Sequence, residues 1–351
     1  MKRILAAIFV LILASISCQT LMPTEPPSAT EMPLVSEATL VVETETQVTS
    51  TPRPTPHPIT CVDDSCLNAC LVRIQDAISI GQIESLGGDY AGTEADLNLV
   101  TYKVKDGELG EPLMLYAPQE FKSFQEDLET QQMVWDYASA LLPPDELKWI
   151  GEYYIFTDNA DNVLAWVSPR GEADRSSWQL AVDIIDAQEP VYLTYTLVHE
   201  FGHLLTLNTD QIPPSDFYFG WGQNPSFCKQ YLDPNGCSTP DSYINHFYQA
   251  FWVDIFEEWR DTVEKVRADT DDEYFALVDE FYSRHENEFV RDYAASNIHE
   301  DMAESFTYFV LEPKPEGDSV IDQKIRFFYD FPEMVALRQQ IIQNVCSYTA
   351  E

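Results

Sequence analysis

The amino-acid sequence predicts an α+β fold in which a small mixed sheet backs one helix and the C-terminal half of the chain is mostly helical. Two observations support this prediction. A helical pattern over residues 119–142 is followed by three strand-like stretches, and helical periodicity returns after residue 243 and continues to the end of the chain. Strands and helices that are grouped in this way, without regular alternation, are typical of α+β domains.

The first residues have the pattern of a secretory signal. Lys2 and Arg3 precede the apolar run from Ile4 to Ala14, which is short for a membrane-spanning helix. Small residues and then Cys18 follow, and this resembles the cleavage box of bacterial lipoproteins, in which the cysteine becomes the lipidated first residue. We therefore predict a signal peptide over residues 1–17 and a lipid anchor at Cys18, with ordinary cleavage and release as the alternative.

Residues 18–60 are rich in Thr, Pro, Ser and Glu and end in a proline-rich run. Such a segment cannot bury enough apolar surface to fold, and its prolines keep the backbone extended. We predict a disordered stalk that holds one folded domain, residues 61–351, outside the cell. Residues 61–115 could instead form a separate N-terminal extension of that domain.

The charge of the chain excludes one class of partner. It carries 20 Lys and Arg residues against 59 Asp and Glu residues, a formal net charge of −39. This charge repels phosphate backbones and anionic lipid surfaces, so we predict no nucleic-acid partner and membrane attachment only through the lipid. The acidity is typical of a soluble extracellular surface, and a cleft that attracts basic substrates or Ca²⁺ is the alternative.

Cysteine parity predicts disulfides. Of the seven cysteines, six remain when Cys18 is set aside, enough for three bridges in an oxidising compartment. Cys228 and Cys237 are expected to form a local pair, and Cys346 to bridge the two ends of the folded region. Its partner is expected among three cysteines, Cys61, Cys66 and Cys70. The rival role of these three as metal ligands lacks a fourth ligand nearby.

Local patterns place the elements of the first half. Residues 97–104 and 112–116, which flank a turn containing Gly107, are predicted to form a hairpin. The helical pattern over residues 119–142 is stopped by two prolines. The three strand-like stretches that follow cover residues 152–157, 162–168 and 178–185.

The next helix contains the run His199-Glu200-Phe201-Gly202-His203. Residues four apart lie on one face of a helix, so His199 and His203 can direct ring nitrogens at one metal ion. Glu200 is placed to take a proton from a water that zinc has made acidic, which is the chemistry of the His-Glu-x-x-His pattern. The alternative is that the two histidines are ordinary groups on the helix surface.

The remaining residues of this helix indicate how it packs. Leu197, Phe201 and Leu204 form a stripe that lies largely opposite the histidines and is expected to pack on the sheet. Pro190 suits the first helical turn. Gly202 costs about 1 kcal/mol relative to alanine inside a helix, which indicates that another part of the chain approaches its backbone closely.

A second pattern lies downstream of this helix. The HEFGH run is followed by Tyr293, six residues, Glu300, three residues and Glu304. The two patterns together resemble the catalytic domain of anthrax toxin lethal factor and related zincin peptidases, and the likeness extends loosely over residues 192–310. It implies that His199, His203 and Glu300 bind one Zn²⁺ ion and that Glu200 is the general base. It also implies that Tyr293 stabilises the transition state and that Glu304 orients a ligand histidine.

Each downstream residue also has an alternative role. Asn297 and Glu300 have the spacing of a capping box, so Glu300 could close the N-terminus of a helix. Tyr293 could be an ordinary packed tyrosine. His299 is the alternative third ligand.

The sequence thus predicts a secreted or lipid-anchored zinc metalloendopeptidase with a zincin-like fold and a peptide or protein substrate. Residues 178–185 are expected to be the edge strand to which substrate adds, and residues 210–241 a long loop beside the site. The activity and substrates of the toxin do not carry over, because this chain has a signal and a stalk where the toxin has partner-binding domains. The alternatives are a catalytically silent surface-binding lipoprotein with the same fold and a zinc hydrolase of a non-peptide amide.

Overall fold

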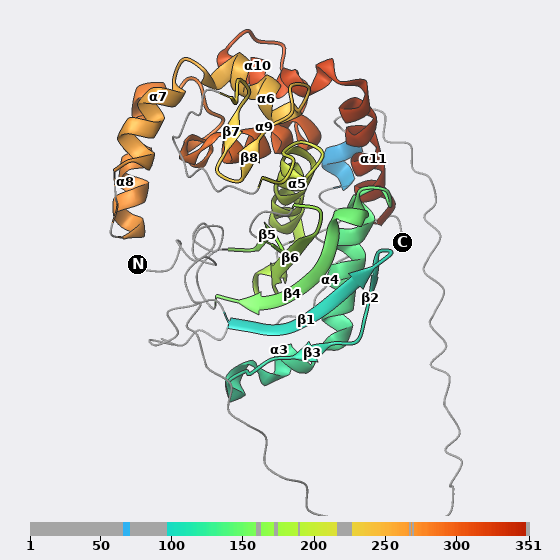
Figure 1. The fold of residues 1–351 in the computed structure, drawn as a ribbon. Helices are drawn as coiled ribbons and strands as arrows, with labels where there is room; N and C mark the ends of the chain where they lie inside the picture. The colour runs from blue at the N-terminus through green and yellow to red at the C-terminus, as the bar shows by residue number, and fades with distance from the viewer. Residues whose placement is uncertain are drawn as a thin grey trace, which may run out of the picture.

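The computed structural model describes residues 66–70, 97–158, 163–171, 175–188, 190–215, 227–266, 268 and 270–348 (Figure 1). The predicted signal peptide, Cys18, the predicted stalk and Cys61 lie outside these residues. None of the helices in the described part combines the length and the apolar character that crossing a membrane requires.

A mixed sheet of six strands forms one side of the fold, as predicted (Figure 1). The strands are β1 (Leu97–Lys105), β2 (Glu108–Leu109), β3 (Leu113–Met114), β4 (Ile150–Thr157), β5 (Ala165–Pro169) and β6 (Trp178–Asp183). Their order is β2-β1-β4-β6-β5, and β3 also pairs with β1. β4 and β6 are parallel, whereas the other pairs are antiparallel.

The predicted hairpin is confirmed, with its second arm divided into β2 and β3. Asp106 and Gly107 link β1 to β2, and both have positive φ angles, 54° and 80°. A two-residue hairpin turn of this hand needs positive φ at both positions, which glycine adopts without cost and aspartate tolerates. The Asp-Gly pair therefore sets the register of the hairpin.

The prediction that residues 178–185 form the edge strand is wrong. β6 lies between β4 and β5, so Leu180 faces Tyr153 on one side and Val167 on the other. Five of the six residues of β6 are buried, as befits an inner strand. The strand order depends on the pairing of β6 with β4, which a local pattern does not contain, and β5 is the edge strand instead.

Helices cover the sheet and connect it to the second half of the chain. Those of the first half are η1 (Gln119–Phe121), α3 (Lys122–Glu126), α4 (Leu128–Leu141), η2 (Leu147–Trp149), η3 (Asp186–Gln188) and α5 (Pro190–Leu207). The helix predicted over residues 119–142 is interrupted at Asp127, whose carboxylate accepts a hydrogen bond from the backbone N–H of Thr130 at 3.1 Å. Asp127 thereby caps a new helix and ends the previous one.

The second half is mostly helical, as predicted. A short hairpin of β7 (Leu232–Asp233) and β8 (Gly236–Cys237) precedes it. Its helices are α6 (Tyr243–Phe247), η4 (Tyr248–Trp252), α7 (Phe256–Trp259), η5 (Arg260–Glu264), α8 (Asp271–His285), η6 (Asp292–Ser296), α9 (Ile298–Leu311), α10 (Val320–Phe327), η7 (Phe328–Asp330) and α11 (Pro332–Tyr348).

Helix α5 lies between the sheet and the helical half (Figure 1). It begins at Pro190, and its apolar stripe is buried as predicted, since Leu197, Phe201 and Leu204 are at most 1% exposed. A Cβ atom on Gly202 would lie only 3.2 Å from the Cα atom of Ala303 in α9. The glycine therefore lets α5 and α9 approach closely, which confirms the expected near neighbour.

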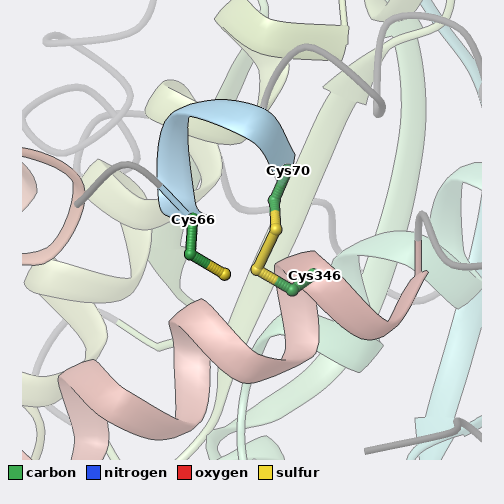
Figure 2. Close-up of side chains that lie close together, drawn as sticks. All are labelled: Cys66, Cys70 and Cys346. Atoms are coloured by element: carbon green, nitrogen blue, oxygen red, sulfur yellow. A yellow bond between two sulfur atoms is a disulfide. The ribbon is translucent and has the colours of Figure 1, made fainter. Parts of the chain in front are cut away.

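Two disulfides in the described part agree with the predicted pairs. Cys70 bonds Cys346 across a sequence separation of 276 residues, and Cys228 bonds Cys237. Figure 2 shows Cys66 beside the first bridge, and the three sulfur atoms there lie within 4.8 Å of one another. Cys66 is itself disulfide-bonded. Sulfur atoms held in a disulfide do not act as thiolate ligands, so these cysteines cross-link the chain and do not form a metal site.

A buried ion pair joins α9 to α10. Lys324 Nζ lies 2.7 Å from Asp301 Oδ2, and both side chains are 0% exposed. Trp252 Nε1 donates a hydrogen bond to the same oxygen at 2.7 Å, and Lys324 Nζ lies 4.1 Å from the centre of the Phe289 ring. Because both side chains are buried, water cannot replace the ammonium group as the partner of the Asp301 carboxylate.

We expect Lys324→Met to lower the free energy of unfolding by about 3–5 kcal/mol, because it leaves Asp301 as a buried charge without its counter-ion. Urea denaturation followed by circular dichroism measures this change. Lys265→Met is the matched control, because Lys265 pairs with Asp261 at the surface, where the side chains are 52% and 57% exposed. Equal stability of the two variants would contradict the expectation.

Candidate metal centre

Helices α5 and α9 bring His199, His203 and Glu300 together. The Nε2 atom of His199 lies 3.1 Å from Glu300 Oε2, and that of His203 lies 3.4 Å from the same oxygen. The three side chains are 11%, 11% and 13% exposed. The two imidazole rings are 4.8 Å apart and nearly perpendicular. Two histidines one turn apart on α5 thus converge on one carboxylate from the first turn of α9.

The spacing of these atoms fits one zinc ion. Ligand atoms about 2.0–2.1 Å from a tetrahedral zinc ion lie about 3.3 Å from one another. The two measured nitrogen–oxygen separations, 3.1 Å and 3.4 Å, lie on either side of that value. Two imidazole nitrogens and one carboxylate oxygen also make up a typical catalytic zinc site, in which the fourth position serves water and substrate.

The charges around the site favour a cation. Burial alone would raise the pKa of the Glu300 carboxyl, but His203 and His199 hold it well below its ordinary value. Burial would lower the pKa of His199, whereas the neighbouring carboxylates of Glu300 and Glu304 raise it to about 10. The carboxylates therefore stabilise positive charge at this point, whether a proton or a metal ion carries it.

Glu304 lies behind His199, on the side away from Glu300. Its Oε1 atom is 3.1 Å from His199 Nδ1, so the His199 ring lies between the two carboxylates. Arg291 Nε donates a hydrogen bond to Glu304 Oε2 at 2.8 Å, and Arg291 Nη2 donates to Oε1. Contacts on both ring nitrogens fix the orientation of the imidazole.

Glu200 lies between the histidines in sequence but faces the sheet edge. Its Oε2 atom accepts a hydrogen bond from the backbone N–H of Val167 in β5 at 3.0 Å. Burial raises the pKa of the Glu200 carboxyl, and the nearby histidines oppose this increase. A carboxylate with a raised pKa is a stronger base than an exposed one. The sequence carried no signal for Val167, because a backbone amide contributes this contact.

Tyr293, in η6, stands at the side of the cluster. The centre of its ring is 6.2 Å from that of His199. Burial raises the pKa of the Tyr293 phenol well above its ordinary value, and the carboxylates of Glu300 and Glu200 raise it further. The phenol therefore keeps its proton at neutral pH and can donate a hydrogen bond.

The residues at the start of α9 separate the alternative roles of Glu300 and His299. The Asn297 side chain accepts hydrogen bonds from the backbone N–H groups of His299 and Glu300, at 2.8 Å and 3.1 Å, and so caps α9. The carboxylate of Glu300 is directed at the histidines. His299 Nε2 lies 3.1 Å from Asp233 and 3.0 Å from the hydroxyl of Tyr231. The His299 ring therefore supplies none of the three converging ligand atoms, which belong to His199, His203 and Glu300.

A buried network that the sequence did not indicate holds this part of α9. Asp233 is 0% exposed, and its Oδ1 atom lies 2.9 Å from Arg175 Nη2. Burial alone would raise the pKa of Asp233, but Arg175 and His299 lower it to about 2. Asp233 lies in the hairpin that the disulfide of Cys228 and Cys237 closes. The described part of the predicted loop over residues 210–241 therefore does lie beside the site, and braces it.

A second acidic group lies at the end of β4 and β6. Oxygen atoms of Asp158, Asp183 and Asp186 lie within 4.8 Å of one another. Burial raises the pKa of Asp183 to about 7 and that of Asp186 to about 6. Backbone N–H groups of Ile185 and Asp158 donate to Asp183, each at 2.7 Å. Proton uptake and these backbone contacts relieve the repulsion within the group.

Comparisons of this chain with protein-family models, with curated proteins and with solved structures found no match. The structure brings His199, His203 and Glu300 to one point and places Glu200, Tyr293 and Glu304 around them.

Proposed function

We propose that this protein is a zinc metallopeptidase of zincin-like fold that hydrolyses peptide bonds outside the cell. The observation that carries the proposal is the convergence of the His199 and His203 Nε2 atoms on one oxygen of Glu300. Two imidazole nitrogens and one carboxylate oxygen that meet at one point are the protein ligands of a catalytic zinc site built from two histidines and one glutamate.

The residues around this point have the properties that peptide hydrolysis needs. Bound zinc would make water acidic and polarise a carbonyl group. Glu200, held by the Val167 amide, accepts the proton of the attacking water and delivers it to the leaving amine. The phenolic O–H group of Tyr293 donates a hydrogen bond to the oxyanion that develops on the substrate. Glu304 keeps the ring of His199 turned toward the site.

The edge of the sheet supplies a place for the substrate. β5 is the last strand in the order, and Val167 connects it directly to Glu200. A peptide in extended form would lie along β5 and pair with the main-chain groups of this strand other than the Val167 N–H, which Glu200 already occupies. Pro169, the last residue of β5, lacks an N–H group and would end this pairing.

The proposal includes the location of the protein. The signal-like N-terminus and Cys18 favour export followed by lipid anchoring, and release is the alternative. The two disulfides in the described part weakly favour an oxidising compartment.

Metal removal tests the proposal. We expect the purified chain to contain one zinc ion per molecule, as measured by inductively coupled plasma mass spectrometry. It should also cleave casein or members of a peptide library. Treatment with 1,10-phenanthroline should abolish cleavage, and an equimolar amount of Zn²⁺ should restore it. A native chain without stoichiometric zinc would contradict the metal site. Zinc without cleavage of any peptide would favour the silent surface-binding lipoprotein.

A further inference from the structure

One guanidinium group touches two different parts of the candidate site. Arg291 lies just before η6, and its side chain is 54% exposed. Its Nε and Nη2 atoms donate to the two oxygens of Glu304, and its Cζ atom lies 5.4 Å from the centre of the Tyr293 ring. It therefore contacts both the carboxylate behind His199 and the phenol at the side of the cluster.

We propose that Arg291 is a positioning residue that holds Glu304 against His199 and Tyr293 beside the reaction centre at the same time. This inference rests on the proposed function, because it assigns Arg291 a part in zinc binding and in the alignment of the transition-state donor. Arg291 itself touches neither the three ligand atoms nor Glu200, so its effect passes through its two neighbours.

The first neighbour, Glu304, needs a partner of this geometry. Glu304 is 4% exposed. A contact with His199 Nδ1 through one oxygen alone leaves its carboxylate free to rotate about the last torsion angle of the side chain. A planar guanidinium that binds both oxygens removes this freedom. Among the described residues, Arg291 is also the one Lys or Arg that forms an ion pair with Glu200, Glu300 or Glu304. Without it, Glu304 would be a buried charge close to Glu300.

The second neighbour, Tyr293, gains a defined ring position. The positive guanidinium is attracted to the electron-rich face of the ring. Because Glu304 anchors the guanidinium through two hydrogen bonds, the ring packs against a fixed surface. The distance between the phenol and the histidine cluster therefore depends on the same side chain that fixes His199.

Arg291→Gln should weaken both zinc binding and catalysis. We expect zinc affinity to fall about 10- to 100-fold, as for other groups that orient a ligand histidine, and kcat to fall by a similar factor with little change in KM. Arg291→Lys keeps the charge but loses the planar fork, so its zinc affinity should lie between those of the native chain and the glutamine variant. Arg284→Gln is the matched control, because Arg284 also binds two carboxylates, those of Glu258 in α7 and Glu280 in α8, away from the candidate site.

Double variants test how Arg291 acts. If it works through Tyr293 and Glu304, its effects will not add to theirs. In a Tyr293→Phe background, Arg291→Gln should reduce kcat less than it does in the native chain. In a Glu304→Gln background, it should leave zinc affinity nearly unchanged. The visible absorption spectrum of the Co²⁺-loaded chain should change in the same way for Arg291→Gln and Glu304→Gln, since both release the His199 ring.

The measurements are zinc affinity by chelator competition, the Co²⁺ spectrum, and kcat and KM separately. Full additivity, or native zinc affinity and native kcat in a folded Arg291→Gln chain, would overturn the role of Arg291 and leave the proposed function intact. Absence of zinc binding by the native chain would instead remove the proposed function itself. If Arg291→Gln does not fold, Arg291→Lys decides, and native zinc affinity and spectrum in that variant would overturn the inference.

Discussion

A chain in which Glu200 is replaced by glutamine should keep its zinc and lose peptide cleavage, with kcat lower by about 10²–10⁴-fold, the range that positioned proton transfer contributes. The amide side chain has nearly the same shape, and its oxygen can still accept the hydrogen bond that the Val167 N–H group donates at 3.0 Å. What it cannot do is accept a proton from water. The loss should therefore appear in kcat, while KM and metal content stay close to native values.

The measurements are metal content, circular dichroism and cleavage kinetics on the same preparations. Glu152→Gln is a suitable control, because Glu152 is also a buried carboxylate, 7% exposed, but belongs to a different cluster with Arg170 and Lys103. Undiminished cleavage by the Glu200 variant would exclude Glu200 as the base and would leave the zinc site standing.

Replacing Glu300 by alanine should have the largest effect on zinc. It removes the oxygen on which both histidine Nε2 atoms converge, so we expect zinc affinity to fall by more than the ~10- to 100-fold typical of groups that only orient a ligand. Chelator competition measures the affinity. Glu304→Gln should fall inside that smaller range, since Glu304 touches only the far nitrogen of His199.

Asn297→Ala separates ligation from helix capping. The Asn297 side chain caps α9 through the N–H groups of His299 and Glu300, so its loss should lower the free energy of unfolding by about 1 kcal/mol. It should leave zinc affinity close to native. If Glu300→Ala instead behaves like Asn297→Ala, with lower stability and native zinc affinity, Glu300 has only a role in the helix terminus.

The sequence predicted the parts of this fold that depend on neighbours along the chain. The spacing of His199 and His203 and the stripe of Leu197 and Phe201 follow from helical periodicity, and both features are present in α5. The turn at Gly107 follows from the backbone freedom of glycine. The positions of the cysteines at the two ends of the folded region anticipated a bridge to Cys346. Glu300, which follows His199 by 101 residues, came from a resemblance and not from a local pattern.

The features that the sequence did not reveal depend on contacts between distant segments. The position of β6 inside the sheet is set by its parallel pairing with β4. Arg175 meets Asp233 only because the fold brings together segments 58 residues apart. Arg291 precedes Tyr293 by two residues, yet nothing in its immediate sequence shows that its guanidinium reaches Glu304. The residues that position the ligands of a site are therefore harder to predict from a sequence than the ligands themselves.

The bridge between Cys70 and Cys346 has a mechanical consequence. Tension applied to the chain ahead of Cys70 reaches α11 through a covalent bond and does not have to pass along β1. The sheet that carries Val167 is thus outside the direct covalent path of the force, whereas α11 contacts α9 through the hydrogen bond from Arg338 to the Phe309 carbonyl. If the predicted stalk tethers the domain, a pull on it would therefore enter the fold at the C-terminal helix and not at the first strand of the sheet.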